Sequence, residues 1–181
     1  QEALSEISTQ ADRLSKIIQR VRTYAKRQHH EVKQENLSEI VDRALVSFRR
    51  SSLSSGVDVE VKAPGKADAL ADALELELLI VNLLKNAAAA SKDSREKLIS
   101  VQLSEEANEW LLSVSDHGQV ISDKLLSRLS HPAKSFSNGL GLGLSICRLI
   151  AENHGGKLTF KPNNSKGLIV TLHLPKTNKE I

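Results

Sequence analysis

The stretch "SNGLGLGLSICRL", residues 137–149, places three of the chain's nine glycines on alternate positions ahead of an apolar, helix-like segment. Glycine costs about 1 kcal/mol relative to alanine inside a helix, so these glycines do not serve helix formation. Either the segment is a hinge, or a ligand approaches the backbone where the helix begins, as phosphate does at helix N-termini. Neither a P-loop nor a dinucleotide-binding fingerprint is present, because Leu144 follows the last glycine and a loop precedes the first. The run alone leaves both explanations open.

A second signal lies upstream, in the apolar helix predicted over residues 71–92. Asn82 and Asn86 are four residues apart, so both project from one face of that helix. Helix interiors disfavour asparagine, so the presence of two on one face indicates a polar ligand. The alternative is that both are incidental asparagines on an exposed face. Amide oxygens suit Mg²⁺, which commonly takes one or two protein ligands together with phosphate oxygens and water.

Asp116 is the third signal. It lies near the end of a predicted strand, residues 109–118, in phase with Trp110, Leu112 and Val114, so its carboxylate is expected to point inward. A buried carboxylate needs a partner, and the following Gly118 permits a tight turn beside it. An acceptor in an apolar pocket is what an adenine amino group requires. The alternative is an aspartate that only caps the next turn.

The remaining pattern is a mixture of helices and strands. Beyond the helix at 71–92, helices are predicted over 39–54 with Ser38 as N-cap, over 122–129 and over 142–153. Strands are predicted over 57–64, 98–103, 109–118, 157–162 and 167–175, the last two forming a hairpin. This arrangement predicts an α+β fold, a two-layer α/β sandwich with one mixed sheet and helices on one face.

The first 28 residues carry a different pattern, a heptad seam without glycine or proline. Its apolar positions are Leu4, Ile7, Ala11, Leu14, Ile18, Val21 and Ala25. Such a seam needs partner helices, as in a coiled coil or a four-helix bundle. The polar stretch "RQHHEVKQEN" then predicts a linker. The expected domains are therefore residues 1–30 and residues 36–178.

Composition narrows the function. The 181 residues are 40% hydrophobic, enough for a packed core, and the single cysteine excludes an internal disulfide, which favours the cytoplasm. A charge of +3 and an aromatic content of 3% argue against a nucleic-acid partner. No apolar run reaches the roughly 18 residues of a membrane span, so membrane attachment is expected only through regions outside this chain. The first residue, Gln1, suggests a fragment of a longer protein.

Together, "NLLKNA", "DHG" and "GLGLGLSICRLIAENHGG" resemble the N, G1 and G2 boxes of sensor histidine kinases. These kinases share the Bergerat ATP-binding fold with gyrase, the 90-kilodalton heat-shock chaperone and MutL. The segment "QADRLSKIIQRVRTYAKR" resembles the second helix of the family's dimerisation and phosphotransfer hairpin, and "ENLSEIVDRAL" resembles the first helix of the ATP-binding domain. The resemblance covers nearly the whole chain.

The resemblance implies ATP and Mg²⁺ as ligands and a role for each box residue. Asn86 would coordinate the metal, with Asn82 contacting phosphates. Asp116 would bind the adenine amino group beside Gly118. The remaining expected nucleotide contacts belong to a lid and the helix after it: Lys134, Gly139, Gly141, Gly143 and Leu144.

The implied activity is transfer of the ATP γ-phosphoryl group to a histidine on a helix absent from this chain, and then to a response regulator, by a homodimeric parent. Two departures leave a degenerate, non-catalytic dimerisation module as an alternative. Val120 replaces the second glycine of the G1 box, and Leu126 and Leu129 stand where phenylalanines are usual. An ATP hydrolase of the same fold is disfavoured, because Asn82 occupies the position of its water-activating glutamate.

Overall fold

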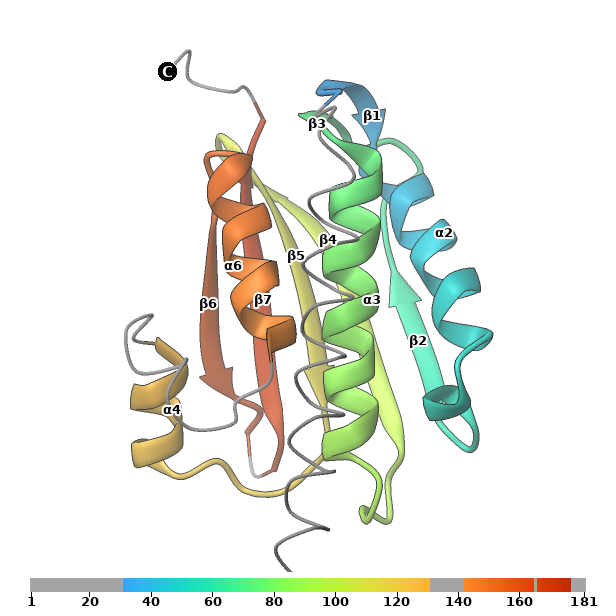
Figure 1. The fold of residues 1–181 in the computed structure, drawn as a ribbon, viewed down its shortest axis with the longest axis vertical. Helices are drawn as coiled ribbons and strands as arrows, with labels where there is room; N and C mark the ends of the chain where they lie inside the picture. The colour runs from blue at the N-terminus through green and yellow to red at the C-terminus, as the bar shows by residue number, and fades with distance from the viewer. Residues whose placement is uncertain (1–30, 131–141, 165, 177–181) are drawn as a thin grey trace, which may run out of the picture. The chain divides into compact units, whose positions relative to one another are not determined.

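The computed structural model of the chain describes residues 31–130, 142–164 and 166–176 (Figure 1). The chain divides into two compact units, Gln1–Glu31 and Val32–Ile181, and the description below concerns the second. The heptad helix predicted for residues 1–28 lies outside the described residues. Among the described helices, none combines the length and the apolar character needed to cross a membrane.

A five-stranded mixed sheet forms one layer of the second unit. Its spatial order is β2 (Asp58–Lys62), β4 (Leu98–Glu106), β5 (Glu109–Asp116), β7 (Leu168–Pro175) and β6 (Lys157–Pro162). The β2 and β4 strands run parallel, and every other neighbouring pair is antiparallel. The interior strands alternate apolar and polar residues, and Val114 of β5 pairs with both Val101 and Val170. The predicted mixed sheet is confirmed.

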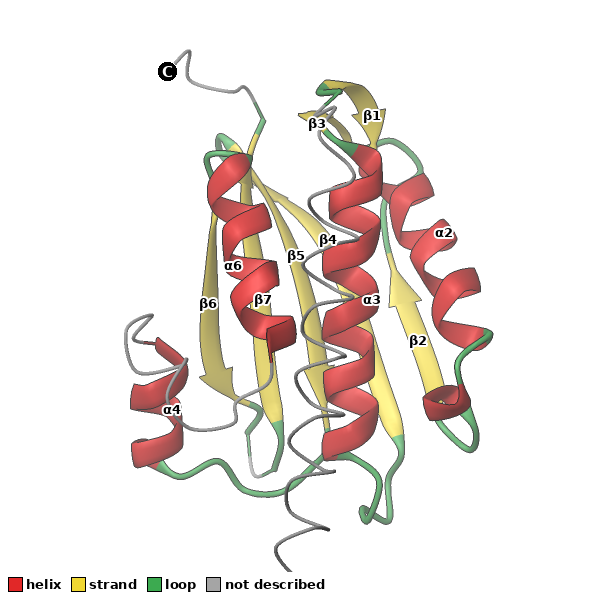
Figure 2. Ribbon diagram, viewed as in Figure 1, coloured by secondary structure: helices red, strands yellow, loops and turns green. Residues whose placement is uncertain are grey.

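Three helices cover one face of this sheet, as Figures 1 and 2 show: α2 (Leu37–Arg49), α3 (Ala73–Ala90) and α6 (Leu142–Asn153). The short helix α4 (Asp123–Ser130) lies against β6 instead, and a 3₁₀ turn, Ser52–Ser54, follows α2. The two-layer α+β architecture is therefore confirmed.

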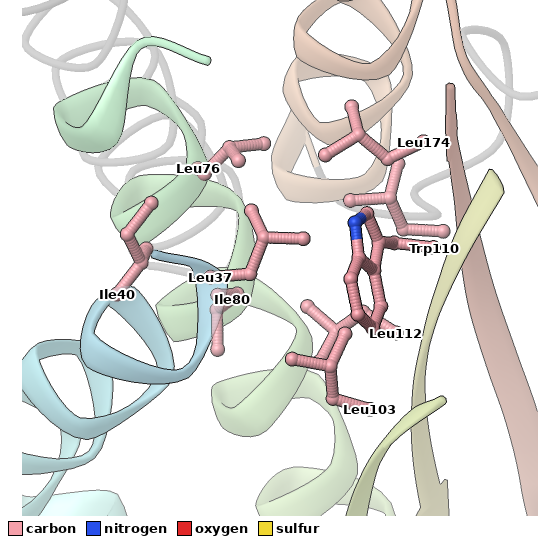
Figure 3. Close-up of a pocket in the computed structure, with 9 residues that line it drawn as sticks. Leu37, Ile40, Leu76, Ile80, Leu103, Trp110, Leu112 and Leu174 are labelled. Atoms are coloured by element: carbon pink, nitrogen blue, oxygen red, sulfur yellow. The ribbon is translucent and has the colours of Figure 1, made fainter. Parts of the chain in front are cut away.

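The core lies between the helices and the sheet. Figure 3 shows apolar side chains of α2, α3 and the strands converging around a small void, among them Ile40, Ile80, Leu112 and Leu174. The void measures about 10 Å³, the space of roughly one water molecule, and its lining is almost entirely apolar. It is a packing defect of the core and has no room for a ligand.

The structure differs from the sequence-based expectations at the N-terminal side of the sheet. Part of the predicted linker forms β1 (Lys33–Asn36), which pairs antiparallel with β3 (Asp68–Ala71). The N-cap of α2 is Asn36, whose side-chain oxygen accepts a hydrogen bond from Ser38 N (3.1 Å). Ser38, predicted as the cap, instead donates its hydroxyl to Pro64 O.

Two helix boundaries also differ. The α2 helix ends at Arg49 rather than at residue 54, because the following serines form the 3₁₀ turn. The α3 helix begins at Ala73 because Asp72 is its N-cap, accepting from the backbone N–H groups of Leu74 (2.9 Å) and Glu75 (3.1 Å).

Candidate functional site

A pocket with a mixed polar and apolar lining lies where α3 ends, beside the end of β5 and the start of β7. It has a volume of about 510 Å³, within the range of small-molecule sites. Its apolar lining includes Leu83, Val114 and Val170. Polar side chains enter it from different elements: Asn86 from α3, Asp93 from the turn after α3, Asp116 from β5 and Gln119 from the loop that follows. The pocket therefore combines apolar surface with a few convergent polar groups.

Asp116 is the buried polar group of this pocket. Its side chain is only 5% exposed, as its place in the strand alternation predicts, and its Oδ1 accepts a hydrogen bond from Gly118 N (2.8 Å). Burial raises the pKa of the Asp116 carboxyl, while hydrogen bonds from the backbone of Gly118 and Leu168 and the nearby His117 oppose that shift. A carboxylate held in this way is a hydrogen-bond acceptor facing an apolar cavity.

Gly118 is required by close packing. A Cβ atom at this position would lie 2.7 Å from Asp116 Oδ1 and 2.8 Å from Ala90 O, at the end of α3. Both distances are shorter than real Cβ contacts. The loop after β5 can therefore pass between Asp116 and α3 only with glycine at this position.

The two asparagines of α3 have different environments. Asn86 is exposed and lines the pocket, and its side chain has no hydrogen-bond partner among the described residues. Asn82, one turn earlier, is half-buried, does not line the pocket, and donates through Nδ2 to Leu78 O (2.9 Å) of its own helix. The pocket thus brings together Asn86 and Asp116, and Asn82 is not among its lining residues.

The side chains that line the pocket could hold a magnesium ion only together with oxygen atoms of a bound ligand. Among the described residues, no group of three or more His, Cys, Asp or Glu side chains is placed to enclose a metal. Asn86 offers one amide oxygen to the pocket. Mg²⁺ is commonly held in this manner, by one or two protein ligands, water and the phosphates of a substrate.

The predicted lid residues divide between described and undescribed parts of the chain. Gly143 and Leu144 belong to the first turn of α6, where Gly143 is buried and Leu144 lines the pocket. Lys134, Gly139 and Gly141 lie outside the described residues. The α6 helix therefore directs its N-terminal end, the positive end of the helix dipole, toward the pocket side of the molecule (Figure 1).

Two of the three positions that depart from the sensor kinase pattern, Val120 and Leu129, also border the pocket. Val120 lines the pocket although 71% of its surface is exposed. In α4, Leu125 and Leu129 line it, and Leu129 is only 4% exposed, whereas Leu126 is not part of the lining. Apolar side chains from α4 therefore close one side of the pocket.

Sequence reasoning missed two residues of the β6–β7 turn that hold Asp116. Asn163 donates its side-chain amide to the Asp116 backbone oxygen (2.8 Å). Gly167 has φ +90°, and a Cβ atom there would lie 2.0 Å from the same oxygen. The stretch "NNSKG" indicated a turn, but no local pattern connects it to a residue 47 positions earlier.

Residues 71–178 match the protein family described as histidine kinase-, DNA gyrase B- and HSP90-like ATPases. The chain is 30% identical to the sensor protein FixL of Bradyrhizobium diazoefficiens, over 98% of this chain and 36% of FixL. It is 28% identical to sporulation kinase B of Bacillus subtilis, over 93% of this chain and 40% of that kinase. The chain spans between 18% and 41% of the lengths of the curated relatives compared.

Solved structures give the same relationship. The catalytic domain of histidine kinase ThkA superposes with a TM-score of 0.70 at 25% identity, covering 82% of this chain and 99% of that domain. ThkA in complex with the response regulator protein TrrA gives a TM-score of 0.73 at 26% identity, covering 94% of this chain and 49% of ThkA.

Proposed function

Because the chain belongs to the family of histidine kinase-, DNA gyrase B- and HSP90-like ATPases, we propose that it is the ATP-binding catalytic part of a sensor histidine kinase. The observation that carries this proposal is the buried Asp116 carboxylate in a 510 Å³ pocket with the free amide of Asn86 at its rim. The Asp116 carboxylate suits the adenine base of ATP, and the Asn86 amide suits its phosphate end. The comparisons with sensor kinases support this assignment.

Asp116 would recognise the base. Its carboxylate accepts a hydrogen bond from the adenine amino group, and the guanine 6-oxo group, which has no hydrogen to donate, is disfavoured at that position. Leu83, Val114 and Leu168 offer apolar surface to the faces of the purine. Gly118 keeps the loop after β5 close to Asp116, so the acceptor stays in place.

Asn86 and the start of α6 would receive the phosphates. The amide oxygen of Asn86 is a ligand for Mg²⁺, which when bound neutralises phosphate charge and orients the γ-phosphoryl group. Backbone N–H groups at Gly143 and Leu144 lie at the helix end that favours anions. We expect Lys134, Gly139 and Gly141 to complete the phosphate contacts from the lid, and Asn82 to contribute from behind Asn86.

Phosphoryl transfer would then require only positioning. The bond from the β,γ-bridging oxygen to the γ-phosphorus breaks as a neutral imidazole nitrogen of the acceptor histidine bonds to that phosphorus, and ADP leaves. The attacking nitrogen carries no proton, so no general base is needed to activate it, and the proton on the other ring nitrogen is released to solvent after transfer. Hydrolysis is disfavoured because Asn82, where related hydrolases carry glutamate, cannot take a proton from water.

The parent protein would supply the acceptor and the dimer. We propose that residues 1–30 are the second helix of a dimerisation and phosphotransfer hairpin, that residues 36–178 are the catalytic domain, and that the acceptor histidine lies on a helix outside this chain. The phosphoryl group would pass to an aspartate of a response regulator. The ThkA structure, solved with its regulator TrrA, supports a partner of that class. We expect a cytoplasmic location for this part of the protein.

Calorimetry tests the proposal directly. The chain is titrated with a non-hydrolysable ATP analogue, with and without Mg²⁺, and Asp116→Ala is titrated in parallel. The expected result is binding that Mg²⁺ tightens and that Asp116→Ala weakens by at least about tenfold, the equivalent of one lost hydrogen bond to a charged group. Absence of binding by the natural chain would favour the degenerate module, which the exposed Val120 at the pocket supports.

A further inference from the structure

Asp116 is the last residue of β5, paired with Ile99 of β4 on one side but beyond the last pair with β7 on the other. The last pair of the β5–β7 ladder is Ser115 with Ile169, and Asp116 follows one residue later. Its carbonyl group therefore lies outside the β5–β7 ladder, although the residue is only 5% exposed. A buried carbonyl of this kind needs a hydrogen-bond donor from elsewhere in the chain.

The β6–β7 turn supplies that donor and a second contact beside it. Asn163 Nδ2 donates to Asp116 O (2.8 Å), and Gly167 N donates to Gln119 O (3.1 Å). The turn and the segment that leaves β5 lie at the same end of the sheet (Figure 1). The segment from Asp116 to Gln119, which contains Gly118, is thus hydrogen-bonded at both of its ends to the β6–β7 turn.

Two backbone hydrogen bonds of Asn163 close the turn. Asn163 N donates to Gly167 O (3.0 Å), and Lys166 N donates to Asn163 O (2.8 Å), so the backbone of Asn163 closes the turn while its side chain reaches Asp116. Gly167 packs directly on the Asp116 carbonyl, because no Cβ fits between them. The turn therefore contacts the Asp116 carbonyl twice, through the Asn163 amide and through Gly167.

We propose that Asn163 is a positioning residue for base recognition: its amide holds the Asp116 peptide so that the carboxylate faces the amino group of adenine. This role rests on the nucleotide-binding function proposed above. The carboxylate and the carbonyl belong to one residue, so a hydrogen bond that holds the carbonyl also restrains the Cα from which the side chain projects. Gly118 N holds Oδ1 from one side, and Asn163 holds the carbonyl from the other.

The test compares two nucleotides that differ only at the recognised group, ADP and purine riboside 5′-diphosphate, which lacks the 6-amino group. Dissociation constants are measured by calorimetry with Mg²⁺ for the natural chain and Asn163→Ala. The natural chain is expected to prefer ADP by at least about tenfold, the value of one hydrogen bond to a carboxylate. In Asn163→Ala that preference falls to less than about threefold, while affinity for the purine analogue changes by less than about twofold.

Asn164→Ala is the matched control, because Asn164 is exposed in the same turn and has φ +36°, which alanine tolerates poorly. It weakens the turn but keeps the Asn163 amide, so it should retain the natural preference for ADP. Loss of preference in both variants would show a merely structural role. If Asn163→Ala does not fold, Asn163→Ser, whose hydroxyl is too short to reach the carbonyl, is measured in the same way.

The outcomes separate this role from the underlying function. Full preference for ADP in Asn163→Ala, with tight binding throughout, overturns the positioning role and leaves the nucleotide site intact. A natural chain that binds neither nucleotide, or both equally, overturns the assignment of Asp116 and this role with it. In the Asp116→Ala background, Asn163→Ala should change ADP affinity by less than about twofold, because the group that it positions is gone.

Discussion

The imidazole of His154, at the end of α6, accepts a hydrogen bond through Nε2 from the backbone N–H of Asp72 (3.0 Å), 82 residues earlier in the chain. Its Nδ1 lies 2.7 Å from Ile150 O, which makes Nδ1 the protonated nitrogen of the neutral ring. Asp72 is the N-cap of α3. His154 therefore ties the start of the helix that carries Asn86 to the end of the helix that begins at the pocket.

Removal of this link should destabilise the fold. In His154→Ala the Asp72 N–H loses its acceptor in a site that is only 2% exposed, and a cavity replaces the ring. The expected loss is roughly 2–4 kcal/mol in the free energy of unfolding, measured by urea denaturation. His154→Gln, whose amide oxygen can accept the same hydrogen bond, should recover part of it. Equal losses in the two variants would show that the hydrogen bond contributes nothing.

The two asparagines of α3 should differ in their effect on Mg²⁺-dependent binding. Asn86→Ala removes the amide that lines the pocket and should abolish most of the tightening by Mg²⁺, a change of about tenfold or more in the dissociation constant. Asn82→Ala is the matched control, and its effect should be smaller because its amide nitrogen is bound within its own helix. Calorimetry with a non-hydrolysable ATP analogue measures both. Unchanged Mg²⁺ dependence in Asn86→Ala would refute the metal-binding role.

Asp116 should make the stability of the protein depend on pH. Burial raises the pKa of its carboxyl above the ordinary value of 3.8, so the folded protein holds this proton more tightly than the unfolded chain. The contribution of Asp116 to the free energy of unfolding therefore falls as the pH rises from 3.8 through the raised pKa, and stays low above it. Asn at this position keeps an acceptor for Gly118 N but carries no charge.

The direction of this pH dependence can be tested by replacing Asp116 with a residue that carries no charge. Urea denaturation of the natural chain and Asp116→Asn, between about pH 4 and pH 8, should show the stability difference shifting in favour of Asp116→Asn as the pH rises. The same substitution should weaken ADP binding, because an ionised acceptor is lost. Parallel stability curves for the two proteins would mean that the Asp116 pKa is the same in the folded and unfolded states.

Gly167 should be far less tolerant of a side chain than another glycine with positive φ. Gly56 has φ +70° and open space around its Cβ position, so Gly56→Ala should cost only the backbone strain, about 1–2 kcal/mol. Gly167→Ala adds a collision with Asp116 O and should cost roughly 2–5 kcal/mol in the free energy of unfolding. Equal losses by urea denaturation would show that the turn moves away from Asp116 without cost.

The sequence predicts most of the sheet and helix layer because their signals are local. The helix predicted over 142–153 and the strand over 157–162 have those bounds in the structure, since apolar periodicity and glycine boundaries define both. The strand β1 was missed because its four residues, KQEN, are polar and exposed or half-buried. Its strand conformation comes from backbone pairing with β3, more than thirty residues later, which no local pattern shows.

The residues of the candidate site were likewise predictable only where their signals are local. Asp116, Gly118 and Asn86 were identified from residue type and spacing within single elements, and the structure places them at or beside one pocket. Their roles in nucleotide binding remain predictions. Asn163 and Gly167 were not identified, because their importance arises from contact with a strand far away in the sequence. Local patterns reveal groups that meet a ligand more readily than groups that hold those groups in place.

The position of β7 in the sheet also has a consequence for biosynthesis. Among the described strands it comes last in the sequence, Leu168–Pro175, yet it lies between β5 and β6. A nascent chain that has not yet released this segment from the ribosome has no β7 to pair with β5, and no turn to cover Asp116. The proposed nucleotide pocket can therefore assemble only after synthesis has passed β7. A chain interrupted before that point would expose the hydrogen-bonding edge of β5 to other chains.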